Sequence, residues 1–247
     1  MNITGNTVLI TGGGSGIGRG LAEAFIERGN DVIVTGRNRD KLIDIESANP
    51  GIHTYQLDVD DPDAITAFSR RVVTDFPALN VLINNAGIMR PETVQDGSTA
   101  IAEAIVATNL LGPIRLTTAL LPHLMTKPHA AVLTVSSGLA FLPRAGFPTY
   151  CATKAAIHSY SQTLRVQLRG TPVQVIELAP PYVQTELTGP HQATDPNAMP
   201  LGDYISETMA LLEIQPDAEE ILVQRVHFQR FAEREGRYAE SFARLNG

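Results

Sequence analysis

A tyrosine and a lysine stand four residues apart in the stretch PTYCATKAA, which runs from Pro148 to Ala156. Four residues are about one helical turn, so on a helix Tyr150 and Lys154 would share a face. An ammonium group beside a phenol favours the phenolate and lowers a tyrosine pKa that is ordinarily about 10. Such a tyrosine can exchange a proton near neutral pH, as a general acid or as a general base.

Cys151, the only cysteine of the chain, lies between these two residues. On a helix it would be turned about 100° away from Tyr150, and no histidine in the stretch is placed to lower the pKa of its thiol. A small packed side chain is therefore a better interpretation of Cys151 than a nucleophile. A single cysteine forms no internal disulfide, which fits a reducing compartment.

Ser137 and Asn109 are the other polar candidates. Ser137 ends an apolar run and could donate a hydrogen bond to a substrate carbonyl oxygen, although the adjacent Ser136 competes for that role and a strand-end cap is the alternative. Asn109 lies inside a long helical pattern, where asparagine is unfavourable. This position predicts a hydrogen bond to backbone, or a kink, whether or not Asn109 takes part in catalysis.

Short apolar runs alternate with helical patterns along the chain, and they must position these residues. The runs are nearly continuously apolar and β-branched, as in parallel strands that are buried on both faces. The pattern predicts one α/β domain over residues 1–247, a Rossmann-type doubly wound parallel sheet of six, possibly seven, strands with helices on both faces. The expected strands are 7–11, 31–35, 52–58, 80–85, 130–137 and 172–180, and the expected helices are 16–28, 39–47, 62–76, 99–125 and 149–169.

Two segments depart from this alternation. Residues 189–215 are rich in proline and glycine, and we interpret them as a substrate-loop insertion. Residues 217–246 have a helical pattern, which argues against a seventh strand and against the oligomer contacts that such a strand supports. We expect a homo-oligomer instead, with a dimer built on helices 99–125 and 149–169 favoured.

The stretch TGGGSGIGRG follows the first expected strand and opens the first expected helix. In that context Gly12 permits a tight turn, Gly16 lets backbone approach a diphosphate, and Gly18 permits close packing. The helix N-terminus offers free N–H groups to an anion. These features predict nucleotide binding.

The end of the second expected strand indicates which nucleotide. Gly36 stands where an acidic residue usually holds the adenosine ribose, and Arg37 follows it. A guanidinium there can bind a 2′-phosphate, which favours NADP(H) over NAD(H), although Arg37 could also be an ordinary surface residue. Asp58, which ends the third strand, could accept from an adenine amino group or cap the next helix.

With these motifs placed, the chain resembles the short-chain dehydrogenase/reductase family. The matching stretches are TGGGSGIG (11–18), NNAG (84–87), ATNLLG around Asn109, TVSSG around Ser137, YCATK (150–154) and PPYVQT (180–185). The resemblance implies hydride transfer between a nicotinamide and a carbonyl carbon, with Tyr150 exchanging the proton. It also implies that Lys154 binds the nicotinamide ribose and that Asn109 positions a water in a proton relay. Pro181 replaces the glycine that usually follows the first proline, and from this we expect a different loop path and substrate access.

The candidate sites follow from the motifs and the resemblance together. The catalytic set is Asn109, Ser137, Tyr150 and Lys154. The cofactor-binding set is Gly12, Ser15, Gly16, Ile17, Gly18, Arg37, Asp58, Val59, Asn85, Ala86, Gly87, Tyr150, Lys154, Val183 and Thr185. Substrate-pocket candidates are Leu139, Phe141, Tyr182 and the 189–215 segment.

Composition limits the possible partners. A net charge of −7 argues against a general nucleic-acid binder. No apolar run approaches the ~18 residues that span a bilayer, the N-terminus does not read as a signal peptide, and the six histidines show no metal-ligand spacing. We therefore expect a cytoplasmic, metal-free NADP(H)-dependent carbonyl reductase or alcohol dehydrogenase acting on a small molecule. The alternative is a non-catalytic NADP(H)-binding sensor or interaction protein on the same fold.

Overall fold

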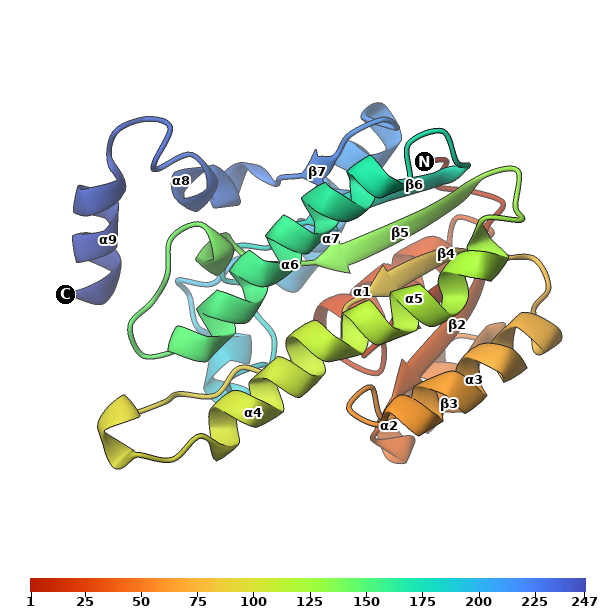
Figure 1. Ribbon diagram of the computed structural model, residues 1–247, viewed down its shortest axis with the longest axis horizontal. Helices are drawn as coiled ribbons and strands as arrows, with labels where there is room; N and C mark the ends of the chain where they lie inside the picture. Colours follow the sequence, from red (N-terminus) through yellow and green to blue (C-terminus); the bar gives the residue numbers. More distant parts are fainter.

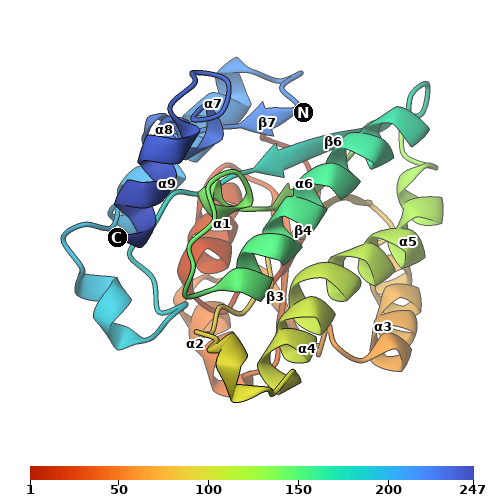
Figure 2. The ribbon, with the colours of Figure 1, turned by 60° about the vertical axis from the view of Figure 1, so that its left-hand side comes forward.

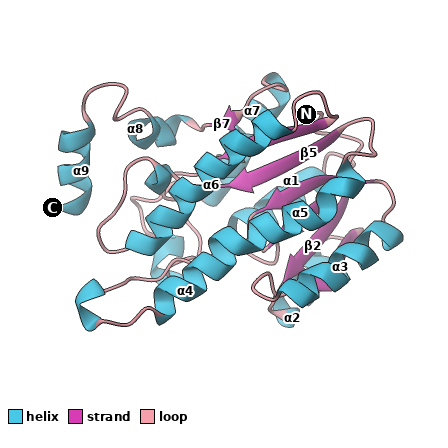
Figure 3. Ribbon diagram, viewed as in Figure 1, coloured by secondary structure: helices cyan, strands magenta, loops and turns pink.

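The six expected strands form the body of a parallel sheet in the computed structural model, which describes residues 1–247. A seventh short strand, β7 (Glu220–Ile221), extends it, in the order β3-β2-β1-β4-β5-β6-β7 (Figures 1 and 3). The middle strands are buried on both faces, which explains their continuous apolar sequence. The bounds are β1 Thr7–Thr11, β2 Asp31–Gly36, β3 Ile52–Gln56, β4 Leu79–Asn84, β5 Ala130–Val135 and β6 Val173–Leu178.

Helices cover both faces of this sheet. One face is covered by α1 (Gly16–Ile26), α2 (Arg39–Ala48) and α7 (Leu201–Ile214), whose apolar side chains form one core with the sheet. The other face is covered by α3 (Pro62–Asp75), α5 (Gly112–Leu124) and α6 (Pro148–Gln167), which form a second core. The predicted doubly wound architecture is confirmed.

The long helix expected over 99–125 is continuous but not uniform. It consists of α4 (Ala100–Val106), a π-helix (Ala107–Leu111) and α5. By length and composition the run Ala100–Leu124 could span a membrane, so the expectation that no stretch approaches that length was wrong. In this fold the run packs against α3, α6, β4 and β5, so it serves as a core helix.

The 189–215 segment is not a loop throughout. After a short 3₁₀ helix at Pro190–Thr194, residues Leu201–Ile214 form α7. Tyr204, Met209 and Leu212 on α7 are almost fully buried against the sheet face that α1 covers. The prolines and glycines that suggested a loop are concentrated before Leu201. The residues after Leu201 have the apolar periodicity of a helix.

The C-terminal segment is likewise more divided than its helical pattern suggested. It contains the two-residue strand β7 (Glu220–Ile221), then α8 (His227–Arg230) and α9 (Tyr238–Asn246). β7 pairs in parallel with β6, so the doubt about a seventh strand was wrong. Figure 2 shows α8 and α9 beyond the sheet, and in Figure 1 they lie on the side toward which β5 points.

Candidate active site

The end of β5 and the start of α6 bring Ser137 and Tyr150 together. Ser137 follows β5 in extended conformation, and its hydroxyl oxygen accepts from Leu139 N at 3.1 Å. Tyr150 lies in the first turn of α6, which begins at Pro148, a residue suited to that position because its missing N–H is not needed there. Tyr150 is 6% exposed.

Lys154 lies one turn further along α6, as predicted. Its ammonium lies 5.6 Å from the centroid of the Tyr150 ring and donates to the carbonyl oxygen of Val135 at 2.7 Å. The side chain is buried, with only 5% of the residue exposed. The carbonyl oxygen of Val135, the last residue of β5, therefore fixes the position of the Lys154 side chain on α6.

The pKa values of this pair differ from the simple expectation. Burial raises the pKa of Tyr150 to about 12, with the Ser137 hydroxyl acting in the opposite direction. Burial also lowers the pKa of Lys154 to about 8. The ammonium donates to Val135 rather than to the phenol, so burial dominates and the predicted lowering of the tyrosine pKa is not found here.

Asn109 occupies the π-helix and bonds to backbone, as its position predicted. Its Oδ1 accepts from Ile88 N at 2.8 Å, and its Nδ2 donates to Ile88 O at 2.9 Å. A Cβ added at Gly87 would lie 3.4 Å from Asn109 Oδ1 and 3.8 Å from Lys154 Nζ. The NNAG stretch, the π-helix and α6 therefore converge at Gly87.

The glycine-rich loop packs directly against the NNAG stretch. Gly12 has a φ of +65°, and a Cβ there would lie 2.8 Å from Ala86 Cα. A Cβ at Gly18 would lie 2.3 Å from Asn85 Nδ2, which donates to the carbonyl oxygens of Thr11 and Gly12. Glycine is required at both positions, and this contact joins the two predicted cofactor motifs.

The N-terminus of α1 fits a diphosphate. Ser15 is its N-cap, and its side chain caps no helix N–H. Across from the loop, a Cβ added at Gly16 would meet only Thr185, at 3.5 Å. Ile17, next in the chain, is half-buried against the first core. The first turn offers free N–H groups, and the space in front of Gly16 lets an anion approach them.

Arg37, Asp58 and Val59 lie at the ends of β2 and β3. The Arg37 side chain is 51% exposed, with Nη1 3.6 Å from Asp60 Oδ2. Asp58 Oδ1 accepts from Asp60 N, while Asp61 caps α3, so the suggestion that Asp58 caps that helix was wrong. The Val59 side chain is buried in the second core.

The loop after β6 is held on both sides of Pro181. On one side Gly138 N donates to the carbonyl oxygen of Pro180, and on the other side Met199 N donates to the carbonyl oxygen of Tyr182. Val183 is buried, and its carbonyl accepts from Gln192 Nε2, which also donates to Thr185 Oγ1. Sequence reasoning missed Gln192, a polar residue that is 4% exposed within a segment that looked like a loop.

The substrate-pocket candidates have different neighbours. Leu139 packs against the small cluster that contains Tyr150. Phe141 instead lies edge-on to His158 at 4.8 Å between ring centroids, and Tyr182 donates to Asp195. A cavity of about 370 Å³ is bordered by Leu139 and Cys151, but none of the four catalytic candidates lines it.

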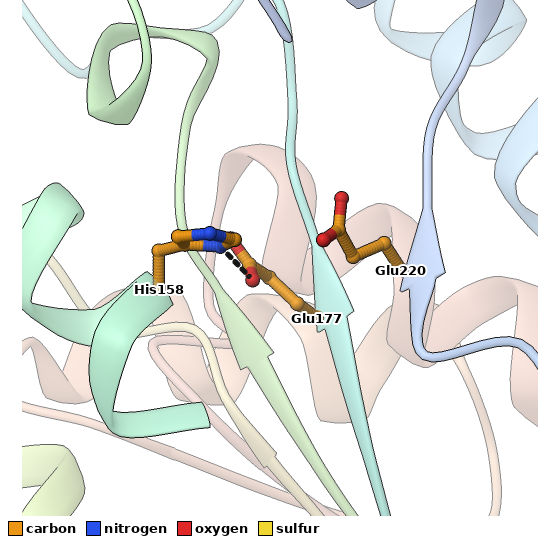
Figure 4. Close-up of side chains that lie close together, drawn as sticks. All are labelled: His158, Glu177 and Glu220. Carbon is orange, nitrogen blue, oxygen red and sulfur yellow. Dashed lines mark hydrogen bonds and ion pairs between the residues drawn. The ribbon is translucent and has the colours of Figure 1, made fainter. Parts of the chain in front are cut away.

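Sequence reasoning also missed a buried polar cluster behind α6. His158, Glu177 and Glu220 come together from α6, β6 and β7 (Figure 4). Glu177 is fully buried. The one available signal was a glutamate in the apolar strand VQVIEL.

Comparisons with known proteins agree with this geometry. The family model described as short chain dehydrogenase matches residues 6–196. The chain is 47% identical over 189 residues to the uncharacterized oxidoreductase DltE of Bacillus subtilis, covering 76% of this chain and 75% of that one.

Two further matches name NADP. The chain is 32% identical to the NADP-dependent 3-hydroxy acid dehydrogenase YdfG of Shigella flexneri over 178 residues, covering 71% and 72% of the two chains. The structure superposes on a short-chain dehydrogenase from Burkholderia cenocepacia in complex with NADP, with a TM-score of 0.83, 24% identity and 99% of each chain covered. From the motifs, the seven-stranded sheet and these matches it follows that the chain belongs to the short-chain dehydrogenase/reductase family of oxidoreductases.

Proposed function

We propose that this protein is an NADP(H)-dependent carbonyl reductase or alcohol dehydrogenase. The observation that carries the proposal is the placement of Ser137, Tyr150 and Lys154 around one buried position at the end of β5. The nicotinamide, when bound, supplies or accepts the hydride. We further propose that the enzyme acts on a small molecule in the cytoplasm as a homodimer.

Each catalytic residue has a defined task in this proposal. Tyr150 gives its phenolic proton to the carbonyl oxygen in reduction and takes it back in oxidation. Ser137 donates a hydrogen bond to the same oxygen, so the two hydroxyls polarise the carbonyl and the proposal requires no metal ion. Lys154 binds ribose hydroxyls and adds positive charge beside the phenol, and Asn109 holds a water for proton transfer.

The cofactor sets follow from the two ends of the site. The glycine-rich loop and the N-terminus of α1 would hold the diphosphate, with Asn85, Ala86 and Gly87 along the adenosine-to-ribose side. Val183 and Thr185 would bind the carboxamide and diphosphate, Val183 through its backbone. Asp58 and Val59 would contact the adenine, again with Val59 offering backbone. Arg37, exposed and only loosely paired, would bind the 2′-phosphate of NADP(H).

The test is turnover by a Tyr150→Phe variant with NADPH over a chemically diverse carbonyl panel. We expect kcat to fall by about 10²–10⁴-fold because the general acid is lost, while NADPH binding, measured by fluorescence, is retained and weakens far less than kcat falls. Tyr160→Phe, the same substitution on the same helix, is the matched control and should keep full activity. Undiminished turnover by Tyr150→Phe would refute the mechanism. A wild-type protein that binds NADPH but reduces no member of the panel would instead favour the non-catalytic sensor.

A further inference from the structure

The strands β5 and β6 present neighbouring anchors to α6. In the register of this pair Thr134 lies beside Glu177, and Val135 lies beside Leu178. Thr134 and Glu177 both bond to α6, through Ser161 at 2.7 Å and through His158 at 2.7 Å. The carbonyl of Val135 accepts from Lys154. Lys154 and His158, one helical turn apart, are therefore fixed by adjacent positions of the same strand pair.

Glu177 has an unusual environment for a carboxylate. The residue is 0% exposed, its Oε2 lies 2.7 Å from His158 Nδ1, and its Oε1 has no hydrogen-bond partner in the chain. A buried carboxylate with one unpartnered oxygen depends on nearby positive charge for its stability. Its charge in turn acts to raise the pKa of Lys154, against the burial that lowers it.

The charged groups around this cluster come from three elements. Arg230 donates through its Nε and a terminal nitrogen to the two oxygens of Glu220, at 2.7 and 2.9 Å. Because this guanidinium already neutralises Glu220, a divalent ion at His158, Glu177 and Glu220 would have to displace it, and we interpret the cluster in Figure 4 as an ion-pair network. The titratable groups around Lys154 and this cluster are Tyr150 and His158 from α6, Glu220 from β7 and Arg230 from α8. Arg165 from α6 acts on the charge of Glu220.

We propose that Glu177 is a positioning residue for the active-site helix: its buried carboxylate keeps the Lys154 ammonium charged and, through His158, holds α6 against β6. The consequence for turnover rests on the proposed function, since only a reaction that needs charged Lys154 would depend on Glu177. The effect on the charge of Lys154 is a property of the chain alone. It can therefore be measured without substrate.

The experiment is an NMR titration of the lysine ε-methylene signals. The chain has only three lysines, Lys41, Lys127 and Lys154, so protein labelled with ¹³C at lysine Cε gives three signals, assigned with Lys41→Arg and Lys127→Arg variants. In the wild type we expect Lys154 to titrate near the value of about 8 that burial produces. In Glu177→Gln the midpoint should fall by about one pH unit, because a neighbouring opposite charge has been removed.

Two further variants sharpen the result. Glu219→Gln removes an exposed carboxylate that pairs with Arg165 at 3.4 Å and should leave the Lys154 midpoint unchanged. Glu177→Met removes the charge without leaving a buried amide, so it replaces Glu177→Gln if that variant folds poorly. It should give the same downward shift of the Lys154 midpoint. An unchanged Lys154 midpoint in the folded Glu177 variants would overturn the proposal.

Turnover gives the second readout. For carbonyl reduction, kcat/KM should decline above a certain pH. In Glu177→Gln this pH should fall by as much as the Lys154 midpoint falls, and in Glu219→Gln it should not change. A midpoint that shifts while this pH stays fixed would overturn the catalytic part of the proposal. A wild type that reduces no carbonyl would refute the proposed function alone, because the NMR result remains readable.

Discussion

Burial and charge oppose one another at Lys154. The unfolded chain holds the lysine proton up to a pKa of 10.5, whereas the folded chain releases it near pH 8. Between these values the unfolded state binds more protons, so stability rises with pH across that range. The penalty for burying this ammonium is therefore fully present below pH 8 and disappears toward pH 10.5.

Lys154→Met should consequently stabilise the protein. At pH 7 we expect the free energy of unfolding to rise by about 1–2 kcal/mol, after allowance for the lost hydrogen bond to Val135. The gain should shrink at pH 10, and turnover should be lost. Urea unfolding at both pH values measures this, with the exposed Lys41→Met as control, expected within ~0.5 kcal/mol of wild type. A larger gain at pH 10 than at pH 7 would contradict the argument.

Arg37 decides cofactor preference in the proposal. Its side chain is half exposed and lies 3.6 Å from Asp60, a pairing weak enough for a phosphate to replace. Arg37→Ala should raise KM for NADPH by about 10–100-fold, because a charge-assisted, bidentate contact is lost, and leave KM for NADH unchanged. Arg70→Ala, an exposed arginine on α3, is the control. A wild type that prefers NADH would refute the role of Arg37 outright.

At the scale of elements, the π-helix at Ala107–Leu111 is the feature that a uniform helical pattern conceals. It places the Asn109 side chain on both backbone groups of Ile88, the residue after the NNAG stretch. Without that side chain, Ile88 would lose a donor and an acceptor at once. The π-helix thus places Asn109 for specific hydrogen bonds to Ile88 and is not a packing defect.

Asn109→Ala should lower the free energy of unfolding by about 2 kcal/mol, because partly buried backbone groups lose their partner. Unfolding in urea followed by circular dichroism measures this change. Leu111→Ala, at the exposed end of the same π-helix, should change the stability much less. Equal losses in the two variants would mean that the Asn109 bonds contribute nothing specific.

At the scale of the whole molecule, the outer faces of α5 and α6 bear on the predicted dimer. Both helices expose apolar residues there, including Val166 on α6 and Met125 just after α5. If these helices form the dimer, Val166→Arg should place a charge in the interface and give a monomer by light scattering. Glu27→Arg, on the exposed end of α1, should leave the mass unchanged. A wild type that is monomeric would contradict the dimer.

Local pattern was enough for most of the framework. Strands of continuous β-branched residues, glycines at the turn after β1 and the four-residue step from Tyr150 to Lys154 each depend on neighbours in sequence. These features therefore located the sheet, the glycine-rich loop and the helix that carries Tyr150 and Lys154. The local pattern gave wrong predictions in two places. The prolines before Leu201 suggested a loop where α7 follows, and a single helical pattern was predicted where the chain forms β7, α8 and α9.

The amino-acid sequence by itself determined the order of elements and which side chains could react, because both follow from short-range periodicity and residue chemistry. Tertiary structure decided the charge state of those side chains. It buried Tyr150 and Lys154, turned the lysine toward Val135, and set Glu177 and His158 behind α6. Desolvation and the field of a buried carboxylate depend on residues far apart in the chain, and no local pattern contains them.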